Sequence, residues 1–594
     1  MSEYKAPLRD IAFSMNEVCG YSEHYRDLIG GEVAEPDLIN TICSEYSRFC
    51  GEVLHPLSRN ADEEGCKFTD GAVTTPTGFK DAYAHYVEGG WPSLSCDPEH
   101  GGQGLPSSLG LLLGEITCAA NMSFALYTGG LSGAIETLAA FGSPEQREAY
   151  EAKLIKGAWN ATMCLTEPHC GTDLGMLKTK SLPQADGSFA ITGTKIFITG
   201  GEHDLTENII HLVLARLPDA PSGSKGISLF IVPKLDPQPD GELRANGVSC
   251  GSIEHKMGIK GSATCVMHFD GSRGIMLGQP NRGLATMFKF INASRVRAAF
   301  QGVAHADLGF QKSLAYARER LQMRAASGPA NPEGPADPII VHPDVRRMLM
   351  TQKVLSEGSR AMLHCLAKQL DISELASSAQ AREAAERRLD LLTPIAKGFA
   401  TEIGFECANH ALQCFGGHGY IREWGVEQNV RDARIATLYE GTTGIQALDL
   451  IGRKVLADGG SALEEYCKEI EAFCVDEQDS PHAGELAPLA REWKSLAQSI
   501  GATALEDPDE VGAASVQFLM YSGYVCLAYQ WAQAAIAASA ALKAGTNEAD
   551  FYSAKLVSAR FYFQHILPRT RSCVVAIDAG AESMMALPED HFVF

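Results

Sequence analysis

The chain has 594 residues, which is too long for one compact core, so several domains are expected. Its 45% hydrophobic and 21% charged residues are typical of a folded soluble protein, and a formal net charge of −23 argues against nucleic acid as a partner. The 17 cysteines are an odd number without a CxxC pair, which indicates reduced core thiols, a cytoplasmic protein and no metal site.

The first part of the chain has mostly helical patterns. Residues 1–160 are predicted to form an N-terminal helical domain, with helices over 36–54 and 105–141 separated by the turn-rich GGWPSLSCDPEHGGQGLP. From 161 to 280, short apolar runs broken by glycines predict a middle β domain. These runs lie at 188–193, 195–201, 209–215, 226–232 and 264–269.

Helical periodicity returns at about residue 283. It predicts a helical bundle domain over 281–455, with long helices at 295–323, 343–370 and about 379–414. Between the first two, the prolines of AASGPANPEGPADPII predict a loop. Residues 456–594 are predicted to be a helical C-terminal extension, so the fold class is α+β and mainly α.

One segment of the extension lacks charged residues. It runs from Val511 to Leu542 and is long enough to cross a bilayer. Its glutamines, serines, tyrosines and many alanines favour a helix or hairpin buried in a bundle, and a peripheral membrane contact is the alternative.

The stretch LYEGTTGIQALDL places a carboxylate just ahead of a helix. Ile445, Leu448 and Ile451 are spaced three apart, as on one helical face, and Thr442 or Thr443 can cap this helix. Glu440 then lies on the preceding loop, where the free N–H groups of a helix start favour an anion. The stretch is either a base beside an anion site or an ordinary helix start with a solvated glutamate.

Three other stretches have a recognisable order. They are MCLTEPHCGTD at 163–173, KIFITGG at 195–201, and QCFGGHGY at 413–420, the last followed by RDAR and YEGT. Together they resemble the acyl-CoA dehydrogenase family, whose patterns are LTEPxxGSD, KxxITNG, QxxGGxGY and RDARxxxxYEGT. The resemblance covers about residues 30–455, and the whole length is similar to the family's longer branch, with an N-terminal helical domain, a middle β domain, a C-terminal helical bundle and an extension.

The resemblance implies an FAD-dependent enzyme that introduces an α,β double bond into an acyl-CoA thioester. Glu440 would take the α proton while FAD accepts the β hydride at N5, since no side chain accepts hydride. The backbone N–H of Glu440 and a flavin hydroxyl would stabilise the thioester oxygen. The resemblance favours a short thioether substrate, 3-methylmercaptopropionyl-CoA, converted to 3-methylthioacryloyl-CoA in dimethylsulfoniopropionate catabolism.

The same resemblance assigns binding residues. The flavin would contact Met163, Cys164, Leu165, Thr166, Thr172, Phe197, Ile198, Thr199, Thr442 and Gly444. The adenosine half of a neighbouring subunit's FAD would contact Arg320, Gln322, Gln413, Gly416 and Gly417, which implies a homodimer or a higher homo-oligomer. The substrate would contact Thr172, Asn292, Arg295, Glu440 and Gly441, with Arg297 as the alternative to Arg295.

Several alternatives remain at this stage. Electrons would pass to an electron-transferring flavoprotein, whereas an acyl-CoA oxidase would pass them to oxygen. A general fatty acyl-CoA dehydrogenase of β-oxidation, a membrane-docked long-chain enzyme and a non-catalytic binding protein are the other candidates. The chain departs from the family patterns with GTD for GSD, ITGG for ITNG, and QMR at 322–324 for QFG. The last departure precedes the proline-rich insert and predicts a longer helix end or a remodelled loop.

Overall fold

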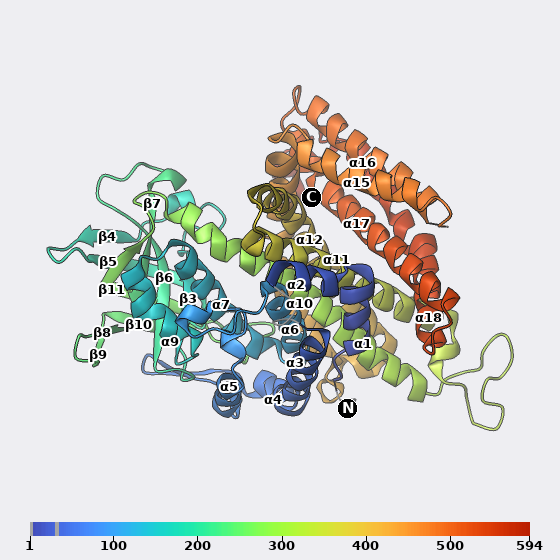
Figure 1. Ribbon diagram of the computed structural model, residues 1–594, viewed down its shortest axis with the longest axis horizontal. Helices are drawn as coiled ribbons and strands as arrows, with labels where there is room; N and C mark the ends of the chain where they lie inside the picture. Colours follow the sequence, from blue (N-terminus) through green and yellow to red (C-terminus); the bar gives the residue numbers. More distant parts are fainter. Residues whose placement is uncertain (1–3, 30–34, 481, 594) are drawn as a thin grey trace. The chain divides into compact units, whose positions relative to one another are not determined.

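The computed structural model describes residues 4–29, 35–480 and 482–593 (Figure 1). The chain divides into two compact units. Unit 1 comprises Met1–Glu45 and Ala298–Phe594, and unit 2 comprises Tyr46–Arg297. The first 45 residues therefore group with the C-terminal helices, which the sequence patterns did not predict.

Unit 2 is built on a seven-stranded sheet, and the β-type runs predicted from the sequence are strands of this sheet. Its strands are β3 (Trp159–Cys164), β4 (Lys180–Pro183), β5 (Phe189–Thr199), β6 (Asn208–Arg216), β7 (Ile227–Pro233), β10 (Val248–Ile253) and β11 (Thr264–Leu277). The order is β10-β11-β5-β4-β6-β3, and β7 joins β11 to β6. Thus β11, β5, β4, β6 and β7 close into a ring, which leaves few free edges.

Both faces of this sheet are covered, as strand β6 shows. Ile210, Leu212 and Leu214 lie in one buried cluster, together with Leu131 of helix α7 (Met122–Phe141). The alternate residue Val213 lies in a second cluster on the other face. Successive strand side chains point to opposite faces, so a strand covered on both sides appears in the sequence as one continuous apolar run.

The remaining elements of unit 2 are short hairpins and helices. The helices include η2 (Cys50–Leu54), α4 (His55–Glu64), α5 (Phe79–Glu88), α6 (Ser107–Ala120), α8 (Pro144–Gln146) and α9 (Ala152–Ile155). The hairpins are β1 (Lys67–Thr69) with β2 (Ala72–Thr74) and β8 (Leu235–Pro237) with β9 (Leu243–Ala245). The predicted helix 105–141 is two helices, because Asn121 adopts an extended backbone and its side chain accepts a hydrogen bond from Phe124 N as the cap of α7. Helix α3 (Pro36–Phe49) contains the boundary between the units.

Unit 1 is helical. Its main elements include α1 (Leu8–Ala12), η1 (Phe13–Val18), α2 (Tyr21–Ile29), α11 (Pro343–Leu375), α12 (Ala379–Phe415), α13 (Val426–Ala433), α14 (Thr443–Leu448), η12 (Asp449–Leu456), α15 (Ser461–Asp476), α16 (Ala483–Thr503), α17 (Asp509–Lys543), α18 (Ala549–Phe561) and α19 (Thr570–Asp578). Helix α10 (Gly283–Glu319) begins in unit 2 and ends in unit 1. The proline-rich insert is a loop, as predicted, and Asp337 closes it by accepting hydrogen bonds from Ala325 N and Asn331 N.

The uncharged segment of the extension forms helix α17. Among the described residues it is the helix long and apolar enough to cross a membrane, but 67% of its most apolar window is buried inside the protein. Trp531 donates to Val354 O of α11 at 3.0 Å, and Tyr521 donates to Leu489 O of α16. These contacts identify α17 as a core helix of the bundle.

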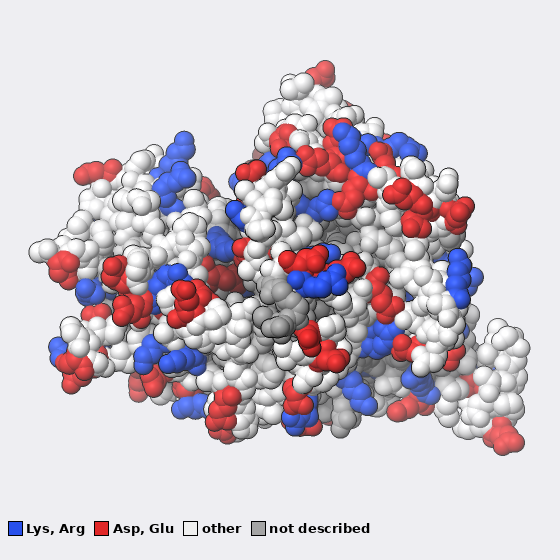
Figure 2. Space-filling view, viewed as in Figure 1, with Lys and Arg blue, Asp and Glu red and all other residues white. Residues whose placement is uncertain are grey.

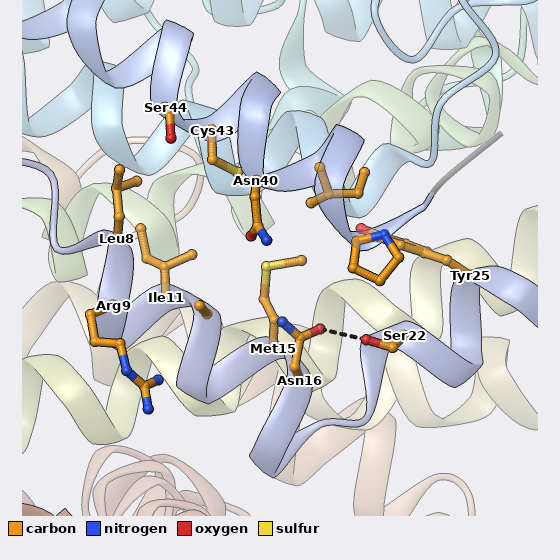
Figure 3. A pocket seen from close by; sticks show the side chains of 13 residues that line it. Leu8, Arg9, Ile11, Met15, Asn16, Ser22, Tyr25, Asn40, Cys43 and Ser44 are labelled. Carbon is orange, nitrogen blue, oxygen red and sulfur yellow. Dashed lines mark hydrogen bonds between the residues drawn. The ribbon is translucent and has the colours of Figure 1, made fainter. Parts of the chain in front are cut away.

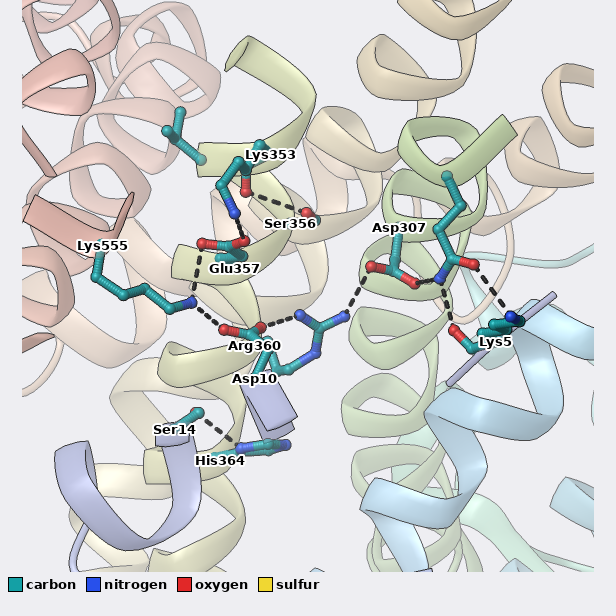
Figure 4. Close-up of polar contacts among 12 residues, drawn as sticks. Lys5, Asp10, Ser14, Asp307, Lys353, Ser356, Glu357, Arg360, His364 and Lys555 are labelled. Carbon is teal, nitrogen blue, oxygen red and sulfur yellow. Dashed lines mark hydrogen bonds and ion pairs between the residues drawn. The ribbon is translucent and has the colours of Figure 1, made fainter. Parts of the chain in front are cut away.

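A network of charged side chains connects helix α1 of the N-terminal segment with the C-terminal helices of the same unit (Figure 4). Asp10 of α1 pairs with Arg360 of α11 and with Lys555 of α18. Lys555 also pairs with Glu357 at 2.9 Å, and Arg360 pairs with Asp307 of α10 at 3.3 Å. Burial alone would raise the pKa of Asp10, but Lys555 and Arg360 hold that pKa below its usual range. These partners lie hundreds of residues from Asp10, so the grouping has no local signal in the sequence.

Charged side chains of both signs are interspersed on the face shown in Figure 2. On the described part of that face, lysines and arginines are accompanied by acidic side chains and do not form a continuous basic stripe. This distribution agrees with the acidic overall composition.

Four buried histidines make the stability of the fold depend on pH. Burial lowers the pKa of His203, His211 and His364 to about 3 and that of His305 to about 4. Their folded-state pKa values lie below the unfolded value, so the stabilising effect is complete above about pH 6.5 and is lost as pH falls toward 4. Each histidine contributes a slope of about 1.4 kcal/mol per pH unit within this window.

We therefore expect the apparent free energy of unfolding, measured by urea denaturation, to fall between pH 7 and pH 5. The variant His211→Gln removes one of these groups. Its free energy of unfolding should therefore change less steeply with pH, by about 1.4 kcal/mol per pH unit, whatever its stability at pH 7. Equal slopes for the variant and the parent would contradict this explanation.

Candidate active site

Glu440 lies in an unusual backbone conformation. Its φ is 57°, in the left-handed region that non-glycine residues rarely adopt, and Gly441 follows with φ 91°. Thr442 is the cap of α14, and its side-chain oxygen accepts from Ile445 N at 3.3 Å. The sequence allowed either Thr442 or Thr443 to be the cap. Thr443 is not the cap, and its hydroxyl donates to Glu402 at 2.5 Å. Strain of this kind occurs where function requires a particular orientation.

Two residues that the sequence analysis did not single out hold this loop. Gln446 donates its side-chain amide to the carbonyl oxygens of Glu440 and Gly441, and Lys397 of α12 donates to Gly441 O at 2.6 Å. Both side chains are fully buried. A charged residue inside the apolar face of helix 379–414 was the signal that could have identified Lys397.

In unit 2, a buried ion pair joins the turn at 163–173 to strand β5. Lys195 donates to Glu167 at 2.9 Å and to Leu165 O at 3.0 Å. Glu167 also accepts from Lys178 N and from the backbone and hydroxyl of Thr179. Burial would raise the pKa of Glu167, but Lys195 and these donors hold that pKa below its usual value. The carboxylate organises the turn and is not a solvent-exposed loop carboxylate.

A β-bulge presents Phe197 to solvent. Strand β11 pairs Cys265 with Ile198 and Met267 with Lys195, so Ile196 and Phe197 together face a single residue of β11. Phe197 has φ 60° and its side chain is 59% exposed. A bulge redirects a side chain, and such bulges are common beside active sites. An exposed aromatic ring on a strained backbone indicates a binding function for Phe197.

The surroundings of Phe197 fit a flavin. Met163, Leu165, Thr166 and Thr199 are half-buried around the ends of β3 and β5, and Ile196 N donates to Thr166 O at 2.9 Å. Apolar side chains beside two hydroxyl groups suit a flat ring that carries hydrogen-bonding edges. The side chains of Cys164 and Ile198 lie in a core cluster instead, so these two residues have only their backbones available to a ligand.

The predicted substrate residues of unit 2 have different environments. Thr172 and Asn292 are exposed, whereas Arg295 is buried, with its guanidinium 6.0 Å from the ring centre of Phe288. Arg297 pairs with Glu136, which holds its guanidinium in the fold.

The predicted adenosine residues all lie on the surface of unit 1. Arg320, Gln322, Gln413, Gly416 and Gly417 are exposed. Nearby His418 stacks on Trp424 with ring centres 4.5 Å apart and hydrogen-bonds Tyr316 at 2.8 Å. His418 therefore stabilises this turn. The departure at 322–324 also has a structural counterpart: Met323 has φ 60°, and Arg324 pairs with Asp337 at the base of the loop.

One group of side chains has the spacing of metal ligands. Ligand atoms of Glu167, His169 and Cys170 lie within 4.8 Å of one another. The ammonium of Lys195 already lies 2.9 Å from Glu167, and a second cation there would be repelled. The donor set thus fits the ion pair better than a metal.

A hollow of about 230 Å³ in unit 1 is lined by residues of the N-terminal helices (Figure 3). Its apolar lining includes Leu8, Ile11, Met15, Tyr25, Ile39 and Cys43. Arg9 at its margin pairs with Glu17 and Glu548. None of the residues predicted from the sequence motifs lines this hollow.

Family models match nearly the whole chain. The model described as acyl-CoA dehydrogenase, N-terminal domain matches residues 39–158, the middle-domain model matches 162–272, and the C-terminal-domain model matches 281–456. A fourth, described as acetyl-CoA dehydrogenase C-terminal like, matches 466–588. The chain belongs to the acyl-CoA dehydrogenase family.

Two curated relatives match this acyl-CoA dehydrogenase over almost its entire length. It is 43% identical to 3-methylmercaptopropionyl-CoA dehydrogenase of Ruegeria pomeroyi, over 95% of the chain and 96% of that protein. It is 33% identical to the broad-specificity linear acyl-CoA dehydrogenase FadE5 of Mycobacterium tuberculosis, over the full length of both.

Solved structures show the same fold. Caenorhabditis elegans ACDH-11, in complex with C11-CoA, matches with a TM-score of 0.75 and 18% identity, over 95% of this chain and 92% of that one. A Bacillus anthracis acyl-CoA dehydrogenase complexed with FAD matches with a TM-score of 0.74 and 20% identity, over 91% and 88%. The expected fold class, the enzyme class and the cofactor FAD are thus confirmed.

The buried ion pair of the acyl-CoA dehydrogenase provides a test of the turn at 163–173. Lys195→Met keeps the length of the side chain but leaves Glu167 buried without its cation, so we expect the free energy of unfolding to fall by about 3 kcal/mol. Because Lys195 also holds Leu165 O, the FAD content measured by absorbance should fall too. Adding Glu167→Gln to this variant should restore part of the stability; a double variant no more stable than Lys195→Met would contradict the ion-pair assignment.

Proposed function

We propose that this acyl-CoA dehydrogenase uses Glu440 as the base that removes the α proton of the acyl-CoA thioester. The main support for this proposal is the backbone of Glu440 within the YEGT motif, which has a left-handed φ and is held by a hydrogen bond from Gln446. A structure tolerates a left-handed glutamate only where surrounding contacts stabilise it, and such residues cluster at active sites. An ordinary helix start does not require this conformation.

The roles of the residues follow from the chemistry of the step. FAD, when bound, supplies the acceptor for the β hydride, which no side chain can provide. Phe197, with Met163, Thr166 and Thr199, is proposed to bind the flavin ring, and Thr442 and Gly444 to bind its phosphate and ribose region. The negative charge that develops on the thioester oxygen is proposed to be stabilised by the backbone N–H of Glu440. Arg295, Asn292 and Thr172 are proposed to contact the CoA moiety.

We propose 3-methylmercaptopropionyl-CoA as the substrate. The support is the relative of that name, which is 43% identical over almost the whole chain, compared with 33% for the broad-specificity relative. A general straight-chain acyl-CoA dehydrogenase is the second candidate, and FadE5 and two butyryl-CoA dehydrogenases of Syntrophomonas wolfei, 32% and 30% identical, favour it.

Three further features belong to the proposed function. Delivery of electrons to an electron-transferring flavoprotein is supported by a related reductase subunit from Acetobacterium woodii, whose name refers to such a complex. A cytoplasmic location is supported by the 17 cysteines, none of which forms a disulfide. A homodimer is supported by the exposed apolar side chains Tyr420, Ile421 and Trp424 beside Gly416 and Gly417. Light scattering tests the dimer, and a monomeric mass for the FAD-loaded enzyme would oppose it.

The base assignment is tested with Glu440→Gln, which keeps the volume of the side chain and removes its basicity. We expect the purified variant to keep its FAD and bind acyl-CoA, and the rate at which acyl-CoA bleaches the flavin absorbance to fall at least about 1,000-fold. Glu464→Gln, at an exposed glutamate of α15, is the control and should bleach normally. Bleaching of Glu440→Gln at the parental rate would exclude Glu440 as the base.

The substrate is tested by kcat/KM for 3-methylmercaptopropionyl-CoA and for straight-chain acyl-CoAs from C4 to C16, with an artificial electron acceptor. We expect the thioether substrate to exceed the others by about tenfold or more, the range in which a fitted apolar pocket discriminates. An optimum at C12 or C16 would overturn the assignment. Hydrogen peroxide formed in step with turnover in air would identify an oxidase.

A further inference from the structure

The carbonyl groups of Glu440 and Gly441 both point into unit 1. Gln446 Nε2 lies 3.1 Å from Glu440 O and 3.3 Å from Gly441 O, and Lys397 Nζ lies 2.6 Å from Gly441 O. We refer to Lys397 and Gln446 as the carbonyl clamp. The clamp determines the orientation of two consecutive peptide planes, and each donor is supplied by a different helix, α12 or α14.

These orientations have a consequence for the other side of the loop. In a trans peptide the N–H points opposite to the C=O, and no cis bond occurs in the described residues. With both carbonyls directed at the clamp, the N–H groups of Gly441 and Thr442 point away from it. The clamp thus keeps the two peptide planes that follow Glu440 from rotating, next to a residue whose φ is 57°.

The clamp is buried, and one of its acceptor atoms lacks a hydrogen-bond partner among the described residues. Lys397 and Gln446 are fully buried, where hydrogen bonds to carbonyl groups are stronger than in water. Gln446 Oε1 is buried and makes no hydrogen bond with the described residues. A buried unsatisfied acceptor is unfavourable, so its persistence indicates that the donors of this amide have a function.

Helix α17 of the C-terminal extension packs directly behind the clamp. A Cβ built on Gly398 would lie 2.6 Å from Leu519 Cδ1 of α17 and 3.4 Å from Gln446 Cβ. One turn further along, a Cβ on Gly523 of α17 would lie 2.2 Å from the Phe399 ring. Glycine on each helix therefore permits α12 and α17 to approach closely, and Leu519 packs on Gly398, the residue after Lys397, where Gln446 also lies close.

We propose that Lys397 and Gln446 are positioning residues for the base Glu440, and that Leu519 of the C-terminal extension holds them in place. This inference rests on the proposed function. It gives the extension a catalytic purpose: the length of chain beyond residue 456 supplies the packing surface that keeps the base loop in its strained conformation.

Positioning has a specific kinetic signature. A base displaced by about 1 Å loses rate in the proton-transfer step by up to about 100-fold. The other proposed acyl-CoA contacts, Thr172, Asn292 and Arg295, lie in unit 2 and are not held by the clamp, so most of the binding of acyl-CoA should be retained. Loss of the clamp is therefore expected to lower kcat while leaving KM nearly unchanged.

The experiment compares matched pairs of variants in the FAD-loaded enzyme. Gln446→Met and Lys397→Met keep side-chain length and remove the donors, and each should lower the rate of flavin bleaching by saturating butyryl-CoA and 3-methylmercaptopropionyl-CoA about 10- to 100-fold. The control is Gln352→Met, at a fully buried glutamine of α11 that donates to Met348 O. Leu519→Ala should slow bleaching, whereas Leu527→Ala, at a buried α17 leucine near Gly358, should leave the rate unchanged.

FAD content, melting temperature and KM are measured on every variant. The inference is supported if kcat falls only for the clamp and Leu519 variants while controls of equal or lower melting temperature keep the parental kcat. It is overturned if the clamp variants bleach at the parental rate, or if kcat follows melting temperature across all variants. Glu440→Gln, measured alongside, separates the two hypotheses: a parental rate in that variant would refute the base assignment itself, whereas parental rates confined to the clamp variants would refute only the positioning.

Discussion

The left-handed backbone of Glu440 is the constraint on which the active-site half of unit 1 depends. This conformation costs about 1–2 kcal/mol for a residue with a side chain. The donors of Gln446 and Lys397 offset that cost by binding the carbonyls of Glu440 and Gly441. Helices α12 and α14 must then lie close enough to supply these donors, and α17 fills the space behind them.

Unit 2 has a similar arrangement in a different fold. Phe197 also has a positive φ, and it projects from a bulge beside a turn whose Leu165 carbonyl accepts from the buried ammonium of Lys195. In both units a buried lysine donates to a backbone carbonyl of a motif loop, Gly441 O in unit 1 and Leu165 O in unit 2, and a residue with positive φ lies in or beside that loop. An ammonium suits this purpose because a charged donor forms a stronger hydrogen bond to a carbonyl than a neutral donor does.

The elements of the fold were predictable to different degrees. The strands of the sheet and the long helices agreed with their apolar patterns, because each pattern reports a local periodicity. The break between α6 and α7 was missed, since Asn121 is a single polar residue in a long apolar run and acts only through its cap on α7. The attachment of the first 45 residues to unit 1 was missed because Asp10 finds Arg360 and Lys555 far along the chain.

The sequence by itself determined the family, the cofactor and the candidate base, because the order of the four motifs along the chain is a covalent property. The tertiary structure alone decided how that base is held. Lys397 lies 44 residues from the carbonyl it binds, and Leu519 comes from a segment outside the motifs altogether. Such contacts arise when helices pack at a distance set by their glycines and large side chains. No local pattern of residues encodes that distance, since it depends on all the helices packing together.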